Sequence, residues 1–452
     1  MNEKEVLVKD LNKGSAIRQL LKFALPLFAS NMLQAVYNVV DMVVVGQFIG
    51  KNGMSGVAIG GNILMLMTFI SLGFGNAGQV LISHAVGAKD YDRIRRLIGT
   101  LFTFLGTAAV VLGAACLLFR IQLLNFMNTP GEAWSYTLSY VVTCCFGLIF
   151  IYGYNIVSSI LRGMGDSRHP FIFISTAAVL NTVLDLLFVT VFGLEVFGAA
   201  LATVIAQGVS FISALVFLYR NRERFCFDFK RKSFGIDREA FPNLIKLGIP
   251  MTIQAASITV SKLVVNSWVN TFGVDYSAVH GVASKIMTIS SLVATSFTTA
   301  GSAMVGQAIG AKKFDRVPEI MRSEFIITFP IFTALSALVL LKPDFLFRLF
   351  TSDAAVLALA VVYVPAAVID FYGAASRTVA FPLITGSGFT KLNFAIAILD
   401  GLAGRIGMSY VLGFILNYGC RGLWIGEALS GFVPLIVGIA FYFSGRWRKN
   451  KS

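Results

Sequence analysis

LLKFALP at residues 20–26 returns as LIKLGIP at residues 244–250, and the final prolines of the two segments stand 224 residues apart. VGAKDYDRI at 86–94 likewise returns as IGAKKFDRV at 309–317, an offset of 223 residues. Glycines later in the chain pair at nearly the same lag, namely Gly163 with Gly386, Gly165 with Gly388, and Gly198 with Gly422. Self-similarity at a fixed lag reports architecture from a single sequence. The chain therefore contains two copies of one structural unit.

The composition indicates that these units lie in a lipid bilayer. The 452 residues are 56% hydrophobic and 13% charged, whereas about 25% of the residues of a soluble domain are charged. A spanning helix needs about 20 apolar residues, and runs that long lie near 19–46, 54–82, 97–119, 134–160, 170–192, 196–219, 243–270, 277–306, 323–341, 355–383, 392–416 and 422–444. An outer-membrane barrel is excluded, because its strands alternate polar and apolar residues over about ten positions. We expect an all-α membrane protein with about twelve transmembrane helices in two pseudo-symmetric six-helix lobes.

Basic residues predict the orientation of the chain. Cytoplasmic loops collect Lys and Arg, and with the N-terminus inside, 29 of the 37 basic residues fall on the inner face. The outer loops hold five, namely Lys51, Arg120, Lys342, Arg348 and Arg421. The polar segment 1–18 leads into a run too long for the core of a signal peptide, so we expect it to be retained. Both termini are therefore expected in the cytoplasm, with the protein in the plasma (inner) membrane.

Six spans in each repeat give both lobes the same orientation, which places their pseudo-symmetry axis along the membrane normal and a cleft between them. We expect an N-terminal lobe at 1–219, a cytoplasmic basic linker at 220–242 and a C-terminal lobe at 243–452. The net charge of +14 is explained by this topology and by attraction to anionic lipids. Because no basic-aromatic nucleic-acid motif is present, we expect the bilayer and not a nucleic acid as a partner, and function as a monomer.

Enzyme signatures are absent from the sequence. None of the three histidines lies in an H-E-x-x-H pattern, and neither a G-x-S-x-G elbow nor a phosphate-binding G-x-x-x-x-G-K loop occurs. Five scattered cysteines suggest neither a disulfide framework nor a zinc site. Gly73, Gly75 and Gly78 spell G-x-G-x-x-G, but no strand precedes them, so close helix packing is their expected role. We expect no catalytic residue and no cofactor.

Ionisable residues within the spans distinguish the two lobes. An Asp at a helix centre costs about 2.5 to 3.5 kcal/mol on insertion scales, so it needs a partner or a purpose. In the second lobe three acids balance three bases, so we expect ion pairs among Lys262, Lys285, Asp370, Asp400, Arg405 and Glu427. In the first lobe, Asp41 and Asp185 have no Lys or Arg deep in any span. A mobile ion must neutralise them, either a proton or a hard cation bound by oxygen ligands.

Two further oxygen donors complete a candidate cation-coupling site in the first lobe. Asn181 lies four residues before Asp185, which puts both on one helix face, and Thr203 adds a hydroxyl. We expect Asp41, Asn181, Asp185 and Thr203 to bind H+ or Na+. The alternative is that Asp41 reaches headgroups while Asp185 bonds to a neighbouring helix. In the second repeat, the positions equivalent to Asp41, Asn181 and Asp185 are Val265, Gly404 and Met408. The polar cluster is therefore not duplicated.

The first helix of each lobe contains a proline, Pro26 or Pro250, which permits a kink. Pro26 lies fifteen residues before Asp41, so a change of charge at Asp41 is expected to alter the packing of this helix. Three more residues are candidates for the substrate cleft, although contacts between helices explain them equally well. These residues are Gln34, Tyr37 and Asn155.

Several motifs resemble the MATE family, multidrug and toxic compound extrusion, from about Ile17 to Trp447. They are FALPLFASNMLQAVYNVVDMVVVGQFIG, GQVLISHAVGAKDYDRI, LRGMGDSRHP, VFGAALATVIAQ and VHGVASKI. The resemblance implies two six-helix bundles, a central cleft open to one side at a time, and export of cationic or amphipathic organic compounds driven by H+ or Na+. In the DinF-like branch, the coupling residues of the first, fifth and sixth helices fall on Asp41, Asn181, Asp185 and Thr203.

Another branch of that family has an acid in the seventh helix, where this chain has Lys262. Asp370 resembles an acidic position of the same branch, but with Lys262 and Lys285 available we favour an ion pair. Our leading hypothesis is a secondary active antiporter that exports small organic drugs or metabolites by alternating access. The alternative is a flippase of lipid-linked precursors in the same fold superfamily, which would use cationic cleft residues for a pyrophosphate head group. Lys262, Lys285 and Arg405 keep that alternative open.

Overall fold

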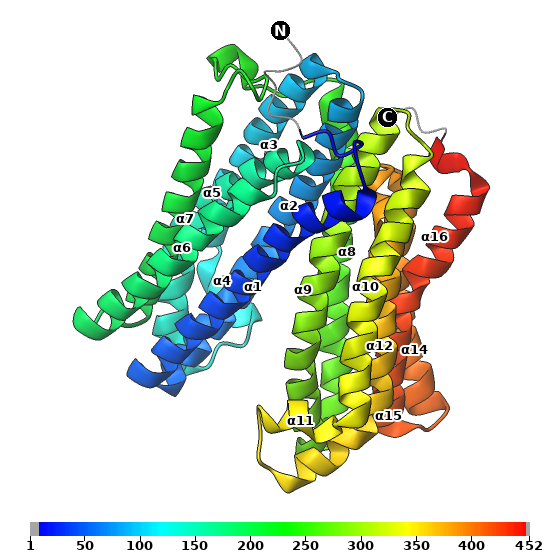
Figure 1. The fold of residues 1–452 in the computed structure, drawn as a ribbon. Helices are drawn as coiled ribbons and strands as arrows, with labels where there is room; N and C mark the ends of the chain where they lie inside the picture. Colours follow the sequence, from blue (N-terminus) through cyan, green and yellow to red (C-terminus); the bar gives the residue numbers. More distant parts are fainter. Residues whose placement is uncertain (1–8, 449–452) are drawn as a thin grey trace. The chain divides into compact units, whose positions relative to one another are not determined.

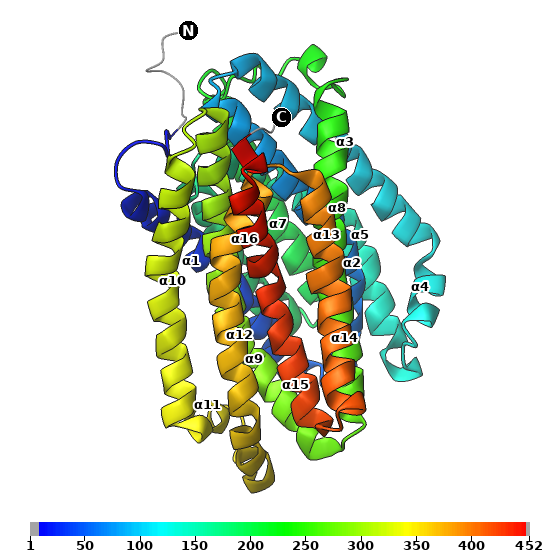
Figure 2. The ribbon, with the colours of Figure 1, turned by 90° about the vertical axis from the view of Figure 1, so that its right-hand side faces the viewer.

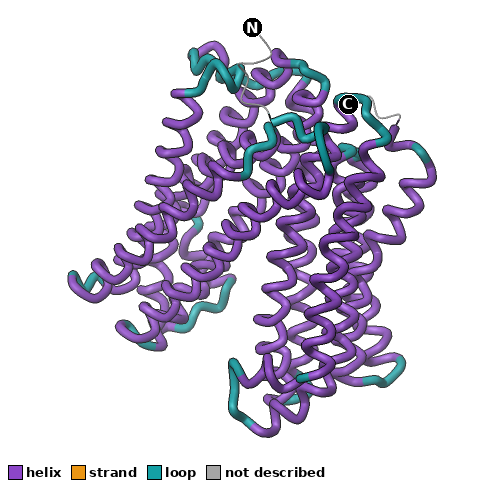
Figure 3. Tube along the Cα trace, viewed as in Figure 1, coloured by secondary structure: helices purple, strands orange, loops and turns teal. Residues whose placement is uncertain are grey.

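The structure, a computed structural model, describes residues 9–448 and contains only helices and loops within that range (Figure 3). The long helices of the first half are α1 (Ala16–Phe48), α2 (Lys51–Gly87), α3 (Tyr91–Leu118), α5 (Trp134–Gly163), α6 (Arg168–Asp185) and α7 (Glu195–Arg220), with the short α4 (Arg120–Phe126) after α3. The α-helices of the second half, long and short, are α8 (Ala240–Asn270), α9 (Val274–Gly310), α10 (Arg316–Leu341), α11 (Pro343–Arg348), α12 (Ala354–Gly386), α13 (Thr390–Ile398), α14 (Arg405–Tyr410), α15 (Gly419–Leu429) and α16 (Val433–Ser444) (Figure 1).

Short π-helical stretches extend α6 and join the pieces of the eleventh expected span. They are Leu186–Val191, Leu399–Gly404 and Val411–Ile415. Eleven helical segments of the described range are long and apolar enough to cross a membrane. The expected span at 277–306 lies in α9, which is 37 residues long but rich in Ser and Thr, and it is not one of the eleven. The predicted fold class, an all-α membrane protein with about twelve transmembrane helices in two lobes, is confirmed.

The repeat of the sequence is also a repeat of the backbone. Three pairs of residues, each 223 positions apart, have positive φ: Gly50 (85°) with Gly273 (113°), Lys89 (57°) with Lys312 (57°), and Gly165 (86°) with Gly388 (69°). Positive φ is uncommon for a residue with a side chain, so the lysine pair is informative. After each lysine the next amide closes the helix end: Asp90 N donates to Ala85 O at 2.9 Å, and Lys313 N donates to Ala308 O at 2.8 Å.

Helix contacts are repeated as well. A Cβ added at Gly163 would lie 2.8 Å from the Gln79 carbonyl oxygen, and one added at Gly386 would lie 2.8 Å from the Ser302 carbonyl oxygen. Real Cβ atoms do not approach so closely, so both contacts require glycine. The paired "RGMG" and "TGSG" motifs therefore mark the same close approach of two helices in each half.

The described chain forms two compact units, one comprising Ala29–Gly248 and the other comprising Asp10–Phe28 together with the residues from Ile249 onward. In the first unit α5 packs on α2, α3 and α7. In the second unit α12 packs on α9, α10, α15 and α16, which Figure 2 shows from the side of α16. The predicted lobes, 1–219 and 243–452, place residues 10–28 in the N-terminal lobe, whereas the structure groups them with the second unit.

The beginning of the chain groups with the second unit because its apolar side chains are buried there. Leu20, Phe23 and Leu27 belong to the hydrophobic core of that unit. The Leu11 amide donates to Gln307 Oε1 at 3.0 Å, and Arg316 Nη2 donates to the Gly14 carbonyl at 2.6 Å. Helix α1 therefore contributes residues to both units, and Pro26 lies two residues before the changeover after Phe28.

The basic segment predicted as an inter-lobe linker at 220–242 packs on α3 of the first unit. Arg95 Nη2 lies 3.2 Å from Asp228 Oδ2 and donates to Ser233 Oγ at 3.0 Å. The Asp237 amide donates to Thr100 Oγ1 at 3.1 Å. A Cβ added at Gly99 would overlap the Ser233 carbonyl oxygen, so this glycine allows the segment to lie directly against α3.

Candidate functional site

Asn181 and Asp185 lie one turn apart on α6, and both side chains are buried. Their exposed fractions are 2% and 0%. Directly after Asp185 the α-helix passes into the π-helical stretch Leu186–Val191. Such π-helical turns within helices occur frequently at functional sites. The two residues predicted for the coupling site therefore share a helix face at a local irregularity of the backbone.

Thr203 of α7 is next to this pair. Asn181 Nδ2 lies 3.4 Å from Thr203 Oγ1, which joins α6 to α7. The remaining oxygens are unsatisfied: Asn181 Oδ1 and both carboxylate oxygens of Asp185 are buried without a hydrogen-bond partner among the described residues. Burial of a polar group without a partner is costly. The oxygens of Asn181 and Asp185 therefore provide a place for a proton or a cation.

Asp41 completes the predicted set from α1. Its side chain is half-buried, and its Oδ1 is buried without a partner in the described range. Val45 of α1 and Val189, which follows Asp185, belong to one hydrophobic core cluster, so the part of α1 that carries Asp41 lies near the end of α6. None of the salt bridges found in residues 9–448 includes Asp41 or Asp185. The structure thus shows two neighbouring intramembrane acids in the first unit without a fixed counter-charge.

Oxygen donors of this kind suit a hard cation, so the residues fit Na+ as well as a proton. No group of three or more His, Cys, Asp and Glu side chains with the arrangement of a metal site occurs in the described part of the chain. The candidate ligands are therefore two acids, an amide and a hydroxyl. Such a set offers hard oxygen ligands rather than the nitrogen and sulfur ligands that zinc prefers.

The candidate cleft residues lie on α1 and α5. Gln34 and Tyr37 are half-buried and one turn apart on α1, and Tyr37 is one turn before Asp41. Asn155 is half-buried on α5, where its carbonyl oxygen would lie 3.9 Å from a Cβ added at Gly75. Gln34 and Tyr37 thus share a helix face with Asp41, while Asn155 lies where α5 packs on α2.

Ion pairs in the second unit form a chain of four residues. Arg377 Nη2 lies 3.1 Å from Asp400 Oδ1, and Arg405 Nη1 lies 3.0 Å from Glu427 Oε1. Arg405 Nη2 lies 4.0 Å from Asp400 Oδ1, which links the two pairs. Three of these residues were among the six predicted from the sequence. Arg377 was missed because it was counted with the inner loops, whereas it lies within α12.

The other three predicted residues do not join this chain. Lys262 and Lys285 are exposed and Asp370 is half-buried. In the part of the chain that the structure describes, none of the three has an oppositely charged group within 4.0 Å. The expected pairing of Asp370 with a lysine is therefore not present. Arg377, on the same helix as Asp370, is half-buried and pairs with Asp400, while the two lysine side chains are exposed.

Sequence reasoning also missed a buried acid, Glu324 of α10. Its side chain is 0% exposed, and both carboxylate oxygens lack a hydrogen-bond partner among residues 9–448. A Cβ added at Gly301 of α9 would overlap Glu324 Oε1, so the carboxyl group lies against the backbone of α9. The residue 223 positions earlier is Leu101, which packs on Gly78 in the same way. An alignment of the two repeats would have identified Glu324, because an acid stands there in place of a leucine.

Comparison with known proteins supports the architecture across both repeats. The family model described as MatE matches residues 26–187 and 250–418, one match in each half. The probable multidrug resistance protein YoeA of Bacillus subtilis is 27% identical over 455 residues, which cover 100% of this chain and 98% of the relative. The probable multidrug resistance protein NorM of Thermotoga maritima is 24% identical over 448 residues, covering 96% of this chain and 93% of the relative.

Solved structures show the same fold. A crystal structure of MATE in complex with MaD3S superposes with a TM-score of 0.88 at 22% identity, covering 98% of this chain and 99% of that one. A crystal structure of MATE in the bent conformation gives a TM-score of 0.86 at 22% identity and covers 96% of each chain. The likeness extends over nearly the whole length of both chains.

Proposed function

This chain belongs to the MatE family, and from that premise we propose that it is a multidrug efflux transporter that works as a cation-coupled antiporter. It exports organic, often cationic or amphipathic, drugs or metabolites by alternating access, in exchange for H+ or Na+. Relatives that cover nearly the whole chain are named as probable multidrug resistance proteins, which supports this substrate class. The proposal places it in the plasma membrane as a monomer with both termini in the cytoplasm.

The observation that carries the proposal is the set of unsatisfied oxygens in the first unit. Asp185 is fully buried and both of its oxygens lack partners in the described range. Asp41 lies one turn before Val45 of α1, which shares a hydrophobic core cluster with Val189, a residue that follows Asp185. With no fixed cation at hand, an ion from solution provides the neutralisation that burial requires. Reversible binding of an ion at a site within the membrane is the property that a cation-coupled transporter requires.

Helix α1 offers a route from ion binding to a change of conformation. Its residues up to Phe28 group with the second unit, whereas the part that carries Asp41 groups with the first. Pro26 lies inside the continuous helix just before this changeover, and because proline has no backbone N–H to donate, the helix bends more easily there. Neutralisation of Asp41 changes the packing of the second part of α1, so ion binding and substrate binding favour different conformations and each opposes the other.

The coupling set supports assignment to the DinF-like branch. The acids of the first unit and the Asn181 to Thr203 contact form one cluster, whereas the seventh expected span carries Lys262 in place of an acid. We therefore place the coupling site in the first lobe, at Asp41, Asn181, Asp185 and Thr203. The second-lobe charges maintain the structure.

The flippase alternative is not favoured. A flippase would need cationic side chains free to bind a pyrophosphate, but Arg405 is 1% exposed and its guanidinium contacts Glu427 and Asp400. The relatives that cover nearly the whole chain are named as probable multidrug resistance proteins.

Efflux from proteoliposomes tests the proposal. Purified protein is reconstituted, ethidium is used as the organic cation, and pH and Na+ gradients are imposed separately at zero membrane potential. We expect ethidium transport against its gradient with one of the two ions and none without a gradient. Transport of a lipid-linked pyrophosphate without transport of any organic cation would replace the proposal with the flippase alternative.

A further inference from the structure

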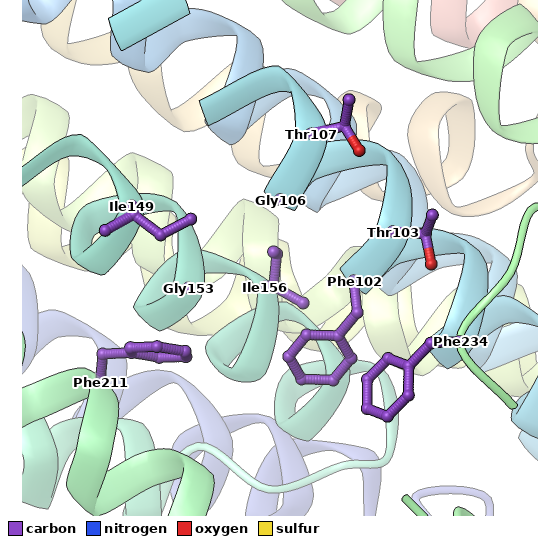
Figure 4. A pocket seen from close by; sticks show the side chains of 9 residues that line it. All are labelled: Phe102, Thr103, Gly106, Thr107, Ile149, Gly153, Ile156, Phe211 and Phe234. Atoms are coloured by element: carbon purple, nitrogen blue, oxygen red, sulfur yellow. The ribbon is translucent and has the colours of Figure 1, made fainter. Parts of the chain in front are cut away.

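An apolar groove on the first unit has no role in the coupling mechanism. Two adjoining cavities form it, with volumes of about 390 Å³ and about 370 Å³. They share the side chains of Phe102, Phe211 and Phe234, which come from α3, α7 and the basic segment after α7. We call the two cavities together the linker groove; Figure 4 shows the first of them.

Glycines create the space in this groove. Nothing lies within 4 Å of a Cβ added at Gly106 of α3, so the position opens into the first cavity. At Gly153 of α5 an added Cβ would lie 2.5 Å from the ring of Phe211, so this glycine makes room for the ring. In Figure 4 the only polar side chains that line the cavity are Thr103 and Thr107. The wall is otherwise hydrocarbon.

The groove is elongated along α7 toward the basic segment. Phe211, Leu215 and Tyr219 line it at intervals of four residues, so they share one helix face over about 12 Å. Phe229 and Phe234 of the basic segment continue the wall, with the Tyr219 and Phe229 ring centroids 5.5 Å apart. The linker groove therefore runs from the spanning helices to the C-terminal end of α7.

Positive charge collects at that end. The Arg222 guanidinium lies 5.2 Å from the centre of the Tyr219 ring, and the exposed side chains of Lys230, Arg231 and Lys232 follow Phe229 directly. Among the described residues, none of these four cations has a salt bridge. The nearby acid Asp228 is occupied: a hydrogen bond from Ser233 Oγ, together with Lys230 and Arg95, holds the pKa of Asp228 below its usual range.

We propose that the linker groove binds one anionic phospholipid. An acyl chain lies along Phe211, Leu215 and Tyr219, and the acidic head group lies among Arg222 and Lys230 to Lys232. An elongated hydrocarbon cavity on spanning helices suits an acyl chain, and unpaired cations at its end complement an anionic head group. Anionic lipids attract clusters of Lys and Arg at the cytoplasmic surface, so the inference rests on the proposed cytoplasmic position of this segment. It does not depend on the coupling ion.

Native mass spectrometry tests the site with the full-length protein in detergent. Phosphatidylglycerol and phosphatidylethanolamine with identical acyl chains are titrated, and bound lipid is counted. We expect at least five-fold tighter binding of phosphatidylglycerol. Gly106→Leu fills the cavity and should weaken phosphatidylglycerol binding at least five-fold. Gly281→Leu is the matched control, because nothing lies within 4 Å of a Cβ there either, and it should bind as the wild type does.

A charge variant separates the head-group site from the hydrocarbon site. Arg222→Gln combined with Lys230→Gln should reduce phosphatidylglycerol binding to the level of phosphatidylethanolamine. Equal binding of the two lipids by the wild type, or unchanged binding by folded Gly106→Leu, would overturn the proposal. Displacement by tetraphenylphosphonium with no selectivity between lipids would show an organic-cation groove instead. If Gly106→Leu fails to fold, the charge variant alone decides.

Discussion

Three fully buried acids of the described range differ in whether a basic side chain lies beside them. Asp185, Asp400 and Glu324 are each 0% exposed. Asp400 lies against Arg377 and Arg405, whereas the oxygens of Asp185 and Glu324 have no partner among the described residues. Because the cost of a buried charge depends on its partners, neutralising Asp400 should affect stability differently from neutralising the other two acids.

For Asp185 we expect loss of function without loss of fold. Asp185→Asn and Asp41→Asn imitate the neutralised state permanently, so the ion can no longer drive a conformational change. Each variant should have at least wild-type expression and thermal stability but lose at least 90% of gradient-driven ethidium efflux in proteoliposomes. Full efflux by a well-folded double variant would remove the coupling role, because no other predicted coupling acid lies in that lobe.

For Asp400 we expect loss of stability. Asp400→Asn removes the carboxylate shared by Arg377 and the buried Arg405, and breaking a buried ion pair costs about 3–5 kcal/mol. The midpoint of thermal unfolding in detergent should fall clearly. Glu319→Gln is the matched control, because it breaks the exposed pair with Arg316 at 2.6 Å, and exposed pairs contribute about 0–1 kcal/mol. Equal melting temperatures for the two variants would contradict the assigned role of this chain of ion pairs.

For Glu324 we expect a gain of stability. Glutamine keeps the shape of the side chain but carries no charge, so the desolvation cost of an ionised carboxylate disappears. Because only the ionised form carries that cost, the advantage of Glu324→Gln should grow as pH rises. Melting temperatures at pH 5 and pH 8 measure it. A variant less stable than the wild type at pH 8 would indicate that the carboxylate has a partner of its own in the membrane.

At the scale of elements, the segment after α7 is held on α3 by close contact as well as by charge. Gly99 lies directly under the Ser233 carbonyl, so a side chain there pushes the segment away. We expect Gly99→Val to speed trypsin cleavage at Lys230, Arg231 and Lys232 about ten-fold. Gly61→Val should leave cleavage unchanged, because nothing lies within 4 Å of a Cβ there. Unchanged cleavage in Gly99→Val would show that charge alone holds the segment.

At the scale of the whole molecule, the basic residues predict which side faces the cytoplasm. Lys232 is exposed, so Lys232→Cys should react with an impermeant maleimide in inverted vesicles and not in intact cells. Lys342→Cys, from a loop predicted outside, should show the opposite pattern. Reaction of Lys232→Cys in intact cells would reverse the proposed topology and with it the lipid leaflet inferred for the linker groove.

The native cysteines give little background in that experiment. Cys116, Cys144, Cys145 and Cys420 are buried. Cys226, in the same segment as Lys232, is half-buried, and burial together with the charge of Asp92 raises the pKa of its thiol. A raised pKa leaves less of the reactive thiolate. Cys226→Ser in the same chain removes the remaining reaction.

The spans and the repeat were predictable from the sequence because both depend on composition and order along the chain. A bilayer requires about 20 apolar residues per helix, whatever the neighbours are, and equal motifs produce equal turns, as Lys89 and Lys312 show. The cluster of Asn181 and Asp185 was predictable for a similar reason, since residues four apart share a helix face.

Only the tertiary structure decided the partners of individual side chains. It selected Arg377 and not a lysine for Asp400, buried Glu324 against Gly301, and grouped Leu20 and Phe23 with the second unit. A count of charges shows how many acids and bases share a lobe but not which of them meet. Contacts between helices depend on distances of a few ångströms in space, and residues 23 positions apart, such as Arg377 and Asp400, come within 3.1 Å only after the helices pack.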